Sequence, residues 1–428
     1  MQRVLVVDKN KEALMPCHPA RARHLLKNGK AAVFRKYPFT IILKEREGGE
    51  TQSVQVKIDP GSKTTGIAMA AGFKRGLRAI WVAQLTHRGQ QIRDDLLSRR
   101  QSRRSRRNRE TRYRKPRFLN RRRPKGWLAP SLLSRVRNIW TWLKRLNRFI
   151  PITHLAMELN RFDTQKLQNP EISGIEYQQG TLQGYEVREY LLEKWGRKCA
   201  YCGATHVPLQ VEHIESKSTG GSDRVSNLTI SCQPCNLAKG TMSAAEFGYS
   251  KIQAQAKKPL KDAAAVNATR YALLKQIELT GLPIETGTGG QTKFNRITQD
   301  YPKTHWLDAV CVGESGRTVF VHSTLAPLLI TAQGRGSRQM CAMNKYGFPR
   351  TKPKQFKRVH SFQTGDIVKA VVTKGKKKGT YVGRVLVRAS SNFDIRTATQ
   401  RVQGISYKYC QPIHRGDGYA YSFSPPTG

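Results

Sequence analysis

Residues 199–239 read CAYCGATHVPLQVEHIESKSTGGSDRVSNLTISCQPCNLAK. Two Cys-x-x-Cys pairs stand at the ends of this stretch, Cys199/Cys202 and Cys232/Cys235, with 29 residues between them. A pair at this spacing can occupy two corners of a zinc tetrahedron, so the two pairs together predict one closed, structural Zn²⁺ site. The gap is wider than in a minimal zinc ribbon, so we expect the site to hold a larger loop.

The loop between the pairs carries residues that suit hydrolysis of a phosphodiester. Histidine is the side chain that ordinarily exchanges a proton near neutral pH, so His213 is a candidate to take a proton from water. Glu212 and Asn236 offer hard oxygen ligands that suit one Mg²⁺ ion. Their order resembles the zinc-stapled form of the HNH nuclease motif, which implies that Asn227 orients the loop or the His213 ring. A zinc ribbon that only binds nucleic acid is the alternative, but a ribbon would not need the Glu-His, Asn-Leu and Cys-Asn pairs together.

Size and charge indicate a multidomain, nucleic-acid-binding protein. A chain of 428 residues is too long for one ordinary core. Its 76 Lys and Arg residues face 29 acidic ones, a net charge of +47 that a polyanion would neutralise. No apolar run approaches the ~18 residues of a spanning helix, and Met1 begins no signal-peptide pattern. Four of the eight cysteines stand in metal-type pairs and the others are scattered, which favours a reducing cytoplasm over a disulfide framework.

Two apolar strands are expected to end in a carboxylate. The run VQVKID predicts a strand that ends at Asp59, before a Pro-Gly turn and a second strand. The run THLAMEL predicts a buried strand that ends near Glu158. A capping role is the alternative for Asp59. The run THWLDAV starts a helix with His305 and Asp308 on one face, where a solvated acid is the alternative for Asp308.

Residues 88–125 are unusually basic, with 17 Lys or Arg against three acids. From Ser98 to Arg112 there is no apolar side chain, so a helix here could bury no face in a protein core. Phosphates could hold it instead, through arginines on successive turns. A disordered basic linker is the alternative. The candidate nucleic-acid-binding residues are Arg99, Arg103, Arg106, Arg107, Arg109, Arg112 and Arg114.

The remaining segments complete seven expected divisions. A small α/β unit with strands at 4–7 and 39–43 comes first. β-like runs with basic Gly-rich turns come last, among them YAYSF at 419–423, and they predict a small antiparallel barrel or sheet. That last domain is expected to contact nucleic acid, a purely structural role being the alternative. The divisions are 1–52, 53–87, 88–126, 127–184, 185–250 (the zinc-stapled module), 251–330 and 331–428.

The order of these features resembles the split RuvC nuclease fold, and most closely the IscB family of transposon-encoded RNA-guided nucleases. The matching runs are IDPGSKTTG, MEL, EHI and HWLDA, in family order. The resemblance implies an α/β and α+β multidomain fold: an RNase H-like mixed sheet, an inserted ββα-metal HNH domain, an arginine-rich bridge helix and a C-terminal β domain. It also implies that Asp59, Glu158 and Asp308 hold two Mg²⁺ ions, assisted by His305.

The same resemblance implies the partners. A structured guide RNA encoded near the gene would pair with one strand of a double-stranded DNA target, and the protein would act as a monomer in the complex. HNH would cut the paired strand and RuvC the displaced strand, while the C-terminal region contacts a flanking DNA motif. The alternatives are a DNA-only HNH endonuclease and a non-enzymatic RNA-binding protein.

Overall fold

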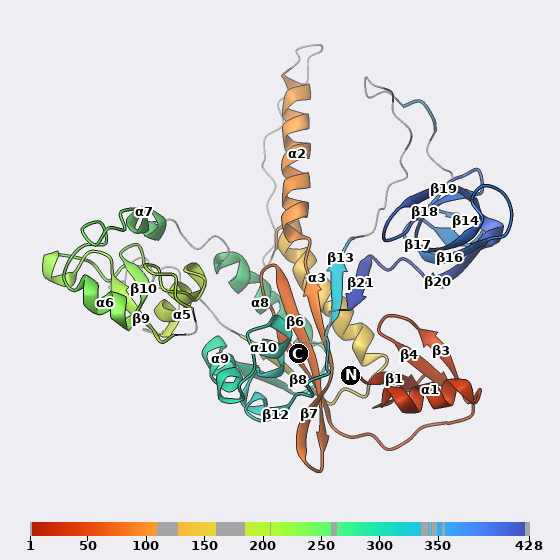
Figure 1. The fold of residues 1–428 in the computed structure, drawn as a ribbon, viewed down its shortest axis with the longest axis horizontal. Helices are drawn as coiled ribbons and strands as arrows, with labels where there is room; N and C mark the ends of the chain where they lie inside the picture. The colour runs from red at the N-terminus through yellow and green to blue at the C-terminus, as the bar shows by residue number, and fades with distance from the viewer. Residues whose placement is uncertain are drawn as a thin grey trace.

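The computed structural model describes residues 2–108, 127–159, 185–205, 207–257, 263–334, 341, 344, 349–352 and 356–423. An eight-stranded mixed sheet lies at the centre, with the other modules around it (Figure 1). The predicted mixed α/β multidomain class is confirmed. Within the described ranges, every helix is too short or too polar to cross a membrane.

The central sheet is assembled from segments far apart in the sequence. Its order is β11-β8-β5-β6-β7-β13-β21, with the short β12 beside β7. Strand β6 is antiparallel to both of its neighbours, β5 and β7, and β8 runs parallel to β5. The bounds are β5 Val54–Asp59, β6 Thr64–Phe73, β7 Gly76–Thr86, β8 His154–Glu158, β11 Ile284–Gly287, β12 Val319–Phe320, β13 Leu328–Ala332 and β21 Tyr419–Phe423.

Strand β5 is buried on both faces, and its alternation separates an apolar row from a polar row. Val54, Val56 and Ile58 join the main hydrophobic core on one face. The residues between them, Gln55, Lys57 and Asp59, are also buried but face the other way. A polar row inside a protein needs partners, and these come from the helices and turns on that second face.

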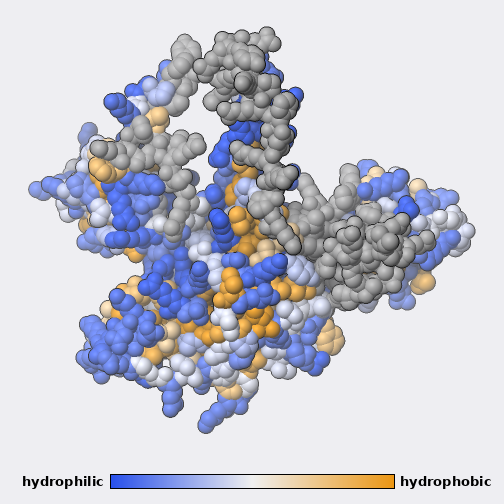
Figure 2. Space-filling view, turned by 180° about the vertical axis from the view of Figure 1, so that it is seen from behind, coloured by the Kyte–Doolittle hydropathy of each residue, from blue (hydrophilic) through white to orange (hydrophobic). Residues whose placement is uncertain are grey.

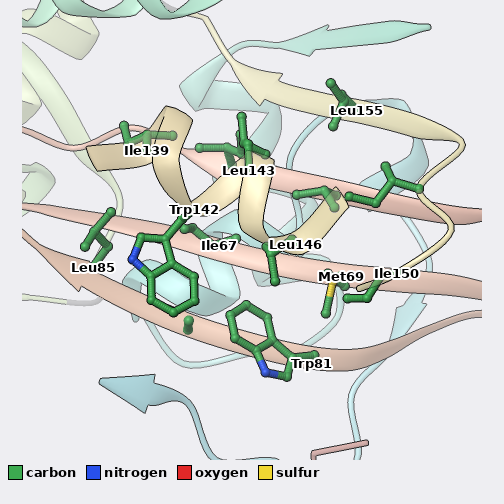
Figure 3. Close-up of a cluster of buried hydrophobic side chains, with 14 of the residues drawn as sticks. Ile67, Met69, Trp81, Leu85, Ile139, Trp142, Leu143, Leu146, Ile150 and Leu155 are labelled. Carbon is green, nitrogen blue, oxygen red and sulfur yellow. The ribbon is translucent and has the colours of Figure 1, made fainter. Parts of the chain in front are cut away.

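Helix α3 (Pro130–Asn147) covers the first face with the apolar side that its sequence predicts. Ile139, Trp142, Leu143 and Leu146 point from α3 onto the strands, where Trp142 stacks on Trp81 with ring centroids 6.4 Å apart (Figure 3). Helix α8 (Ala263–Glu278) adds its own apolar residues to the same core. This packing holds β5 and β6 in place beneath the helices.

Two short helices and a turn cover the second face. They are α9 (Gly289–Thr298), α10 (His305–Val310) and the 3₁₀ turn η3 (Glu314–Gly316). Trp306, Leu307 and Val310 of α10 pack on Ala68 and Val82 of the sheet. Helix α10 therefore lies directly on β6, with its polar positions turned toward the end of β5.

The N-terminal module is a small α/β unit, as predicted, but its sheet has four strands where two were expected. Its strand order is β2-β1-β4-β3, and its own core is small. The Arg3 backbone N–H donates to the Ile80 carbonyl at 2.9 Å, which attaches the module to the central sheet. The bounds are β1 Val4–Val7, β2 Ala13–Cys17, α1 Pro19–Lys27, β3 Ala31–Arg35 and β4 Thr40–Leu43.

The basic run forms helix α2 (Gly89–Arg107), which projects away from the central sheet (Figure 1). Described side chains from Ser98 onward are exposed, and so are Leu96 and Leu97 nearer its base. The expectation that a helix here buries no face therefore agrees with the structure. The opposite view of the molecule shows hydrophilic residues around the periphery of the described surface and a hydrophobic area near its centre (Figure 2).

The inserted module is a separate unit with its own core around Trp195, Tyr201 and Ile230. A two-stranded antiparallel hairpin, β9–β10, is followed by helix α6. Figure 1 shows this module to one side of the central sheet. The bounds are α5 Tyr185–Lys194, β9 Leu209–His213, η2 Lys217–Thr219, β10 Leu228–Cys232, α6 Gln233–Lys239 and α7 Lys251–Lys257.

The C-terminal module is a five-stranded antiparallel sheet of order β19-β18-β17-β16-β20. The prediction that Tyr419–Phe423 belongs to it was wrong, because this strand (β21) pairs with β13 in the central sheet. The apolar ring faces of Tyr419 and Tyr421 pack on Trp142 there. The module's bounds are β14 Arg358–Val359, β15 Phe362–Gln363, β16 Ile367–Val372, β17 Gly379–Val387, β18 Asn392–Arg396, β19 Arg401–Ser406, η4 Tyr407–Tyr409 and β20 Cys410–His414.

Candidate functional site

Two of the predicted acids end neighbouring strands. Asp59 is the last residue of β5 and Glu158 the last of β8, and the two strands are parallel, with Ile58 opposite Met157. The carboxyl ends of parallel neighbours meet at one edge of a sheet. Both acids are largely buried there, at 8% and 7% exposure.

Helix α10 brings the other two predicted residues to the same edge. Gly66 pairs with Asp59 across β5 and β6, and a Cβ at Gly66 would lie 1.8 Å from the His305 carbonyl oxygen. Because this position is glycine, the first turn of α10 can rest on the sheet beside Asp59. The His305 Nδ1 atom lies 3.8 Å from the Asp59 Oδ2 atom, and Asp308 follows one turn later.

Electrostatics agree with this proximity. Burial, together with the negative charge of Asp59, raises the pKa of Glu158 to about 7 and that of Asp308 to about 6. The nearby carboxylate of Asp59 raises the pKa of His305. The ionised carboxylates therefore repel one another, and a divalent cation bound between them would reduce that repulsion.

Two arginines that sequence reasoning missed neutralise part of this charge. The Arg270 Nη2 atom lies 2.8 Å from Glu158 Oε1, and the Arg296 Nε atom lies 2.8 Å from Asp308 Oδ1. Arg270 is 7% exposed within the Ala- and Leu-rich helix α8. An arginine on the buried side of such a helix was the available signal, since buried charges are paired.

The donor set fits Mg²⁺. Asp59, Glu158 and Asp308 provide carboxylate oxygens, the ligands that this hard cation prefers, and a pair of such ions suits phosphodiester chemistry. Within the described ranges, however, the three acids are not gathered as tightly as the cysteines discussed next. Arg270 and Arg296 each hold one of the acids.

The four predicted zinc ligands do converge. The Sγ atoms of Cys199, Cys202, Cys232 and Cys235 all lie within 4.8 Å of one another. Burial and the neighbouring thiols raise the pKa of Cys235, because a thiolate there would be poorly solvated and close to other sulfur atoms. A cation among the four sulfur atoms would stabilise the thiolate form. Four sulfur ligands at this spacing fit a structural Zn²⁺ ion, which prefers tetrahedral thiolate coordination.

His213 ends β9 and is half-buried. Its Nε2 atom lies 2.8 Å from Asp223 Oδ1, and Lys217 Nζ lies 3.0 Å from the same oxygen. A carboxylate only accepts, so the Nε2–H donates and the Nδ1 atom of a neutral ring carries the lone pair. Asp223, which sequence reasoning missed, therefore fixes the orientation of the His213 ring.

Glu212 lies on the opposite face of β9 from His213, since neighbouring residues of a strand alternate. Its carboxylate is buried, 2.7 Å from Lys239 Nζ, and accepts a hydrogen bond from the Tyr201 hydroxyl. Asn236 of α6 donates from Nδ2 to Gln210 Oε1 at 3.0 Å. In these contacts the structure does not join Glu212, His213 and Asn236 into one group.

Asn227 fastens the loop that follows His213. Its Oδ1 atom accepts from the Glu215 N–H at 2.9 Å, and its Nδ2 atom donates to the Glu215 and Ser222 carbonyls at 3.0 and 2.9 Å. Of the two roles expected for this residue, these contacts correspond to orienting the loop.

The basic helix borders a groove at its base. A cavity of about 1300 Å³ lies between α2, α3 and the chain before β21, and Arg88, Arg99 and Arg137 line it. Arg99 and Arg103 are exposed on α2. Arg106 and Arg107 fall in its last turn. Three further candidates lie outside the described residues: Arg109, Arg112 and Arg114.

Two family models match the chain. The RRXRR protein family matches residues 4–180, and the HNH endonuclease family matches residues 199–241. The second match spans the four cysteines, the β9–β10 hairpin and α6, so the predicted HNH endonuclease domain is confirmed. A search of curated proteins finds no match.

Several solved structures are similar at low identity. T. thermophilus RuvC in complex with Holliday junction substrate is 12% identical, with 61% of this chain and 91% of that chain covered and a TM-score of 0.24. The Type II-C Cas9 enzyme from Actinomyces naeslundii is 16% identical, with 45% and 22% covered and a TM-score of 0.17. Streptococcus thermophilus Cas9 in complex with the AGAA PAM is 12% identical, with 60% and 32% covered and a TM-score of 0.21.

The chain thus spans between 22% and 32% of the length of these two Cas9 chains. With TM-scores below 0.5, these similarities are not evidence for a shared overall fold.

Proposed function

We propose that this protein is an RNA-guided DNA endonuclease of the IscB type with two metal-dependent sites. The observation that carries the proposal is the meeting of Asp59, Glu158 and Asp308 at one edge of the central sheet, in a chain that also has an HNH endonuclease domain. In this proposal, HNH cuts the DNA strand paired with the guide and the sheet site cuts the displaced strand.

At the sheet site, Asp59, Glu158 and Asp308 would hold two Mg²⁺ ions. Bound Mg²⁺ makes a water a better nucleophile and stabilises the charge that develops on the leaving oxygen. Arg270 and Arg296 hold Glu158 and Asp308 in place through ion pairs. His305, beside Asp59, is placed to contact the substrate phosphate or to accept a proton.

At the HNH site, His213 acts as the general base. Asp223 holds its Nε2–H, which leaves Nδ1 to accept the proton of the attacking water. Asn227 keeps the following loop in place. Glu212 and Asn236 remain the proposed Mg²⁺ ligands. For Glu212 this requires that the carboxylate exchange its contact with Lys239 for the ion.

The excess positive charge supplies the nucleic-acid contacts. The side chains of α2 that the structure describes from Ser98 onward are all exposed, so Arg99 and Arg103 are available to an RNA backbone. The C-terminal module carries an exposed basic turn, Lys376 to Lys378, and we assign to it the flanking DNA motif. Base pairing with the guide would then select the target sequence.

The test of this proposal is to change the guide. The protein is purified with the RNA that accompanies it, the RNA is sequenced, and its variable segment is replaced. We expect double-strand cleavage to move to DNA matching the new segment. Cleavage that needs no RNA would instead indicate a DNA-only HNH endonuclease, and binding of matched DNA without cleavage in Mg²⁺ would indicate a non-enzymatic protein.

A further inference from the structure

A fully buried lysine lies two residues before Asp59 on the same face of β5. Lys57 has no exposed surface, although it lies on an interior strand of the central sheet, between β8 and β6. A buried ammonium is costly unless it is hydrogen-bonded, so its partners indicate why it is tolerated. None of the roles assigned above involves this residue.

Lys57 holds the chain that leaves α10. Its Nζ atom donates to the Val312 carbonyl at 2.7 Å and to the Ser315 Oγ at 2.6 Å. Val312 lies one helical turn after Asp308, and a cation at the carboxyl end of a helix also suits the helix dipole. Strand β5 therefore carries Asp59 at its end and, through Lys57, grips the end of the helix that carries Asp308.

Other side chains fasten the same turn, residues 311–315. Asn295 of α9 donates from Nδ2 to the Cys311 and Gly313 carbonyls at 3.0 and 2.7 Å. Glu285 of β11 accepts from the Ser315 N–H at 2.9 Å and from its hydroxyl. A Cβ at Gly313 would lie 2.3 Å from Glu285 Oε1, so the turn has little room to shift.

Helix α10 is thus attached to the sheet at both ends. Its first turn rests on Gly66, and the turn that follows it is held by Lys57. Without Lys57, the turn after α10 would keep its contacts with Asn295 and Glu285 but would lose its direct hydrogen bonds to β5, the strand that carries Asp59. The carboxyl end of α10 would then be less closely fixed relative to Asp59.

We propose that Lys57 is a positioning residue that sets the separation between Asp59 and Asp308 by anchoring the carboxyl end of α10 to β5. This inference rests on the proposed function of the acidic site. Substitution of residues behind metal ligands typically lowers metal affinity or activity by about 10- to 100-fold. We expect Lys57→Met to weaken the acidic site by about that factor and to leave the HNH site unchanged.

The test uses the full protein with its RNA and Mn²⁺ as the probe ion. Mn²⁺ binding is titrated by electron paramagnetic resonance, and the sites that Asp59→Ala removes define the acidic site. Displaced-strand and paired-strand nicking are measured on the same samples. Lys57→Met should lower Mn²⁺ affinity at the defined sites and slow displaced-strand nicking alone. Lys74→Met, in the exposed turn between β6 and β7, should leave every measurement unchanged.

Ser315→Ala keeps the proposal testable if Lys57→Met does not fold. It removes one of the two Lys57 contacts and should give a smaller change of the same kind. Normal Mn²⁺ affinity and normal displaced-strand nicking in folded Lys57→Met overturn the inference, and so does an unaffected Ser315→Ala when the lysine variant is unfolded. If Asp59→Ala itself changes neither measurement, the proposed acidic site fails rather than the role of Lys57.

Discussion

At the residue scale, the acidic site consists of three carboxylates that repel one another and two arginines that partly neutralise them. Asp59, Glu158 and Asp308 are each largely removed from water, and burial plus mutual repulsion raises the pKa of the last two. Arg270 and Arg296 offset part of this cost. A divalent cation would offset more, so the site is built to favour metal binding over empty, charged carboxylates.

This competition between protons and metal predicts a pH dependence. With a pKa of about 7 for Glu158 and about 6 for Asp308, both acids gain protons as the pH falls from 8 to 6. A metal ion must displace those protons to bind, so the apparent affinity of the acidic site for the metal decreases as the pH is lowered. We expect the Mg²⁺ concentration for half-maximal displaced-strand nicking to rise over this range, and to rise less for the paired strand. An equal or smaller rise for the displaced strand would contradict the assignment.

The sequence predicted which acids end the strands of the central sheet, but not which side chains pair with those acids. Asp59 and Glu158 end apolar strands, and such a pattern is visible in a sequence. Arg270, Arg296 and Asp223 reach the sites from elements that are distant or irregular, so no local pattern connects them to their partners. Lys57 was visible in VQVKID, yet whether it is buried depends on α10, which is more than 200 residues away.

At the element scale, the outer part of helix α2, from Ser98 onward, has no described side chain buried against the rest of the protein, so tertiary packing does not account for its stability. Helices in water are usually stabilised by an apolar face, and α2 exposes even Leu97, at 51%. Its arginines lie on successive turns, which suits a phosphate backbone. The helix itself could be predicted from the sequence. The groove at its base could not, because it also needs α3 and the chain before β21.

Neutralising α2 should weaken RNA binding and reduce its dependence on salt. Each phosphate contact to RNA contributes about 0.7 to 0.9 to the slope of log affinity against log salt. Changing Arg99 and Arg103 together to Gln should therefore reduce the slope by about 1.4 to 1.8. Arg75→Gln, in the exposed turn between β6 and β7, serves as the control. An unchanged slope in the double variant would mean that these arginines face solvent in the complex.

At the scale of the whole molecule, the central sheet is one unit drawn from the entire chain. Its strands come from residues 54–86, 154–158, 284–332 and 419–423, and the HNH module is inserted between β8 and β11. The sequence order predicted this interruption. It did not predict that the strand at 419–423 returns to the sheet, because that short aromatic run fits either module and only packing on Trp142 separates the two.

This arrangement places two candidate cutting sites on separately folded units. The HNH module has its own hydrophobic core and cysteine cluster, so a substitution in the sheet site should not disturb it. A substitution that inactivates one site should therefore abolish cleavage of one DNA strand and leave cleavage of the other strand unchanged.

Strand-resolved cleavage of matched double-stranded DNA tests this division most directly. The two DNA strands carry different labels, and the protein with its guide RNA is compared as wild type, Asp59→Ala and His213→Ala. We expect Asp59→Ala to leave only the paired strand cut and His213→Ala to leave only the displaced strand cut. Loss of both cuts in either variant, with DNA binding retained, would contradict the two-site account.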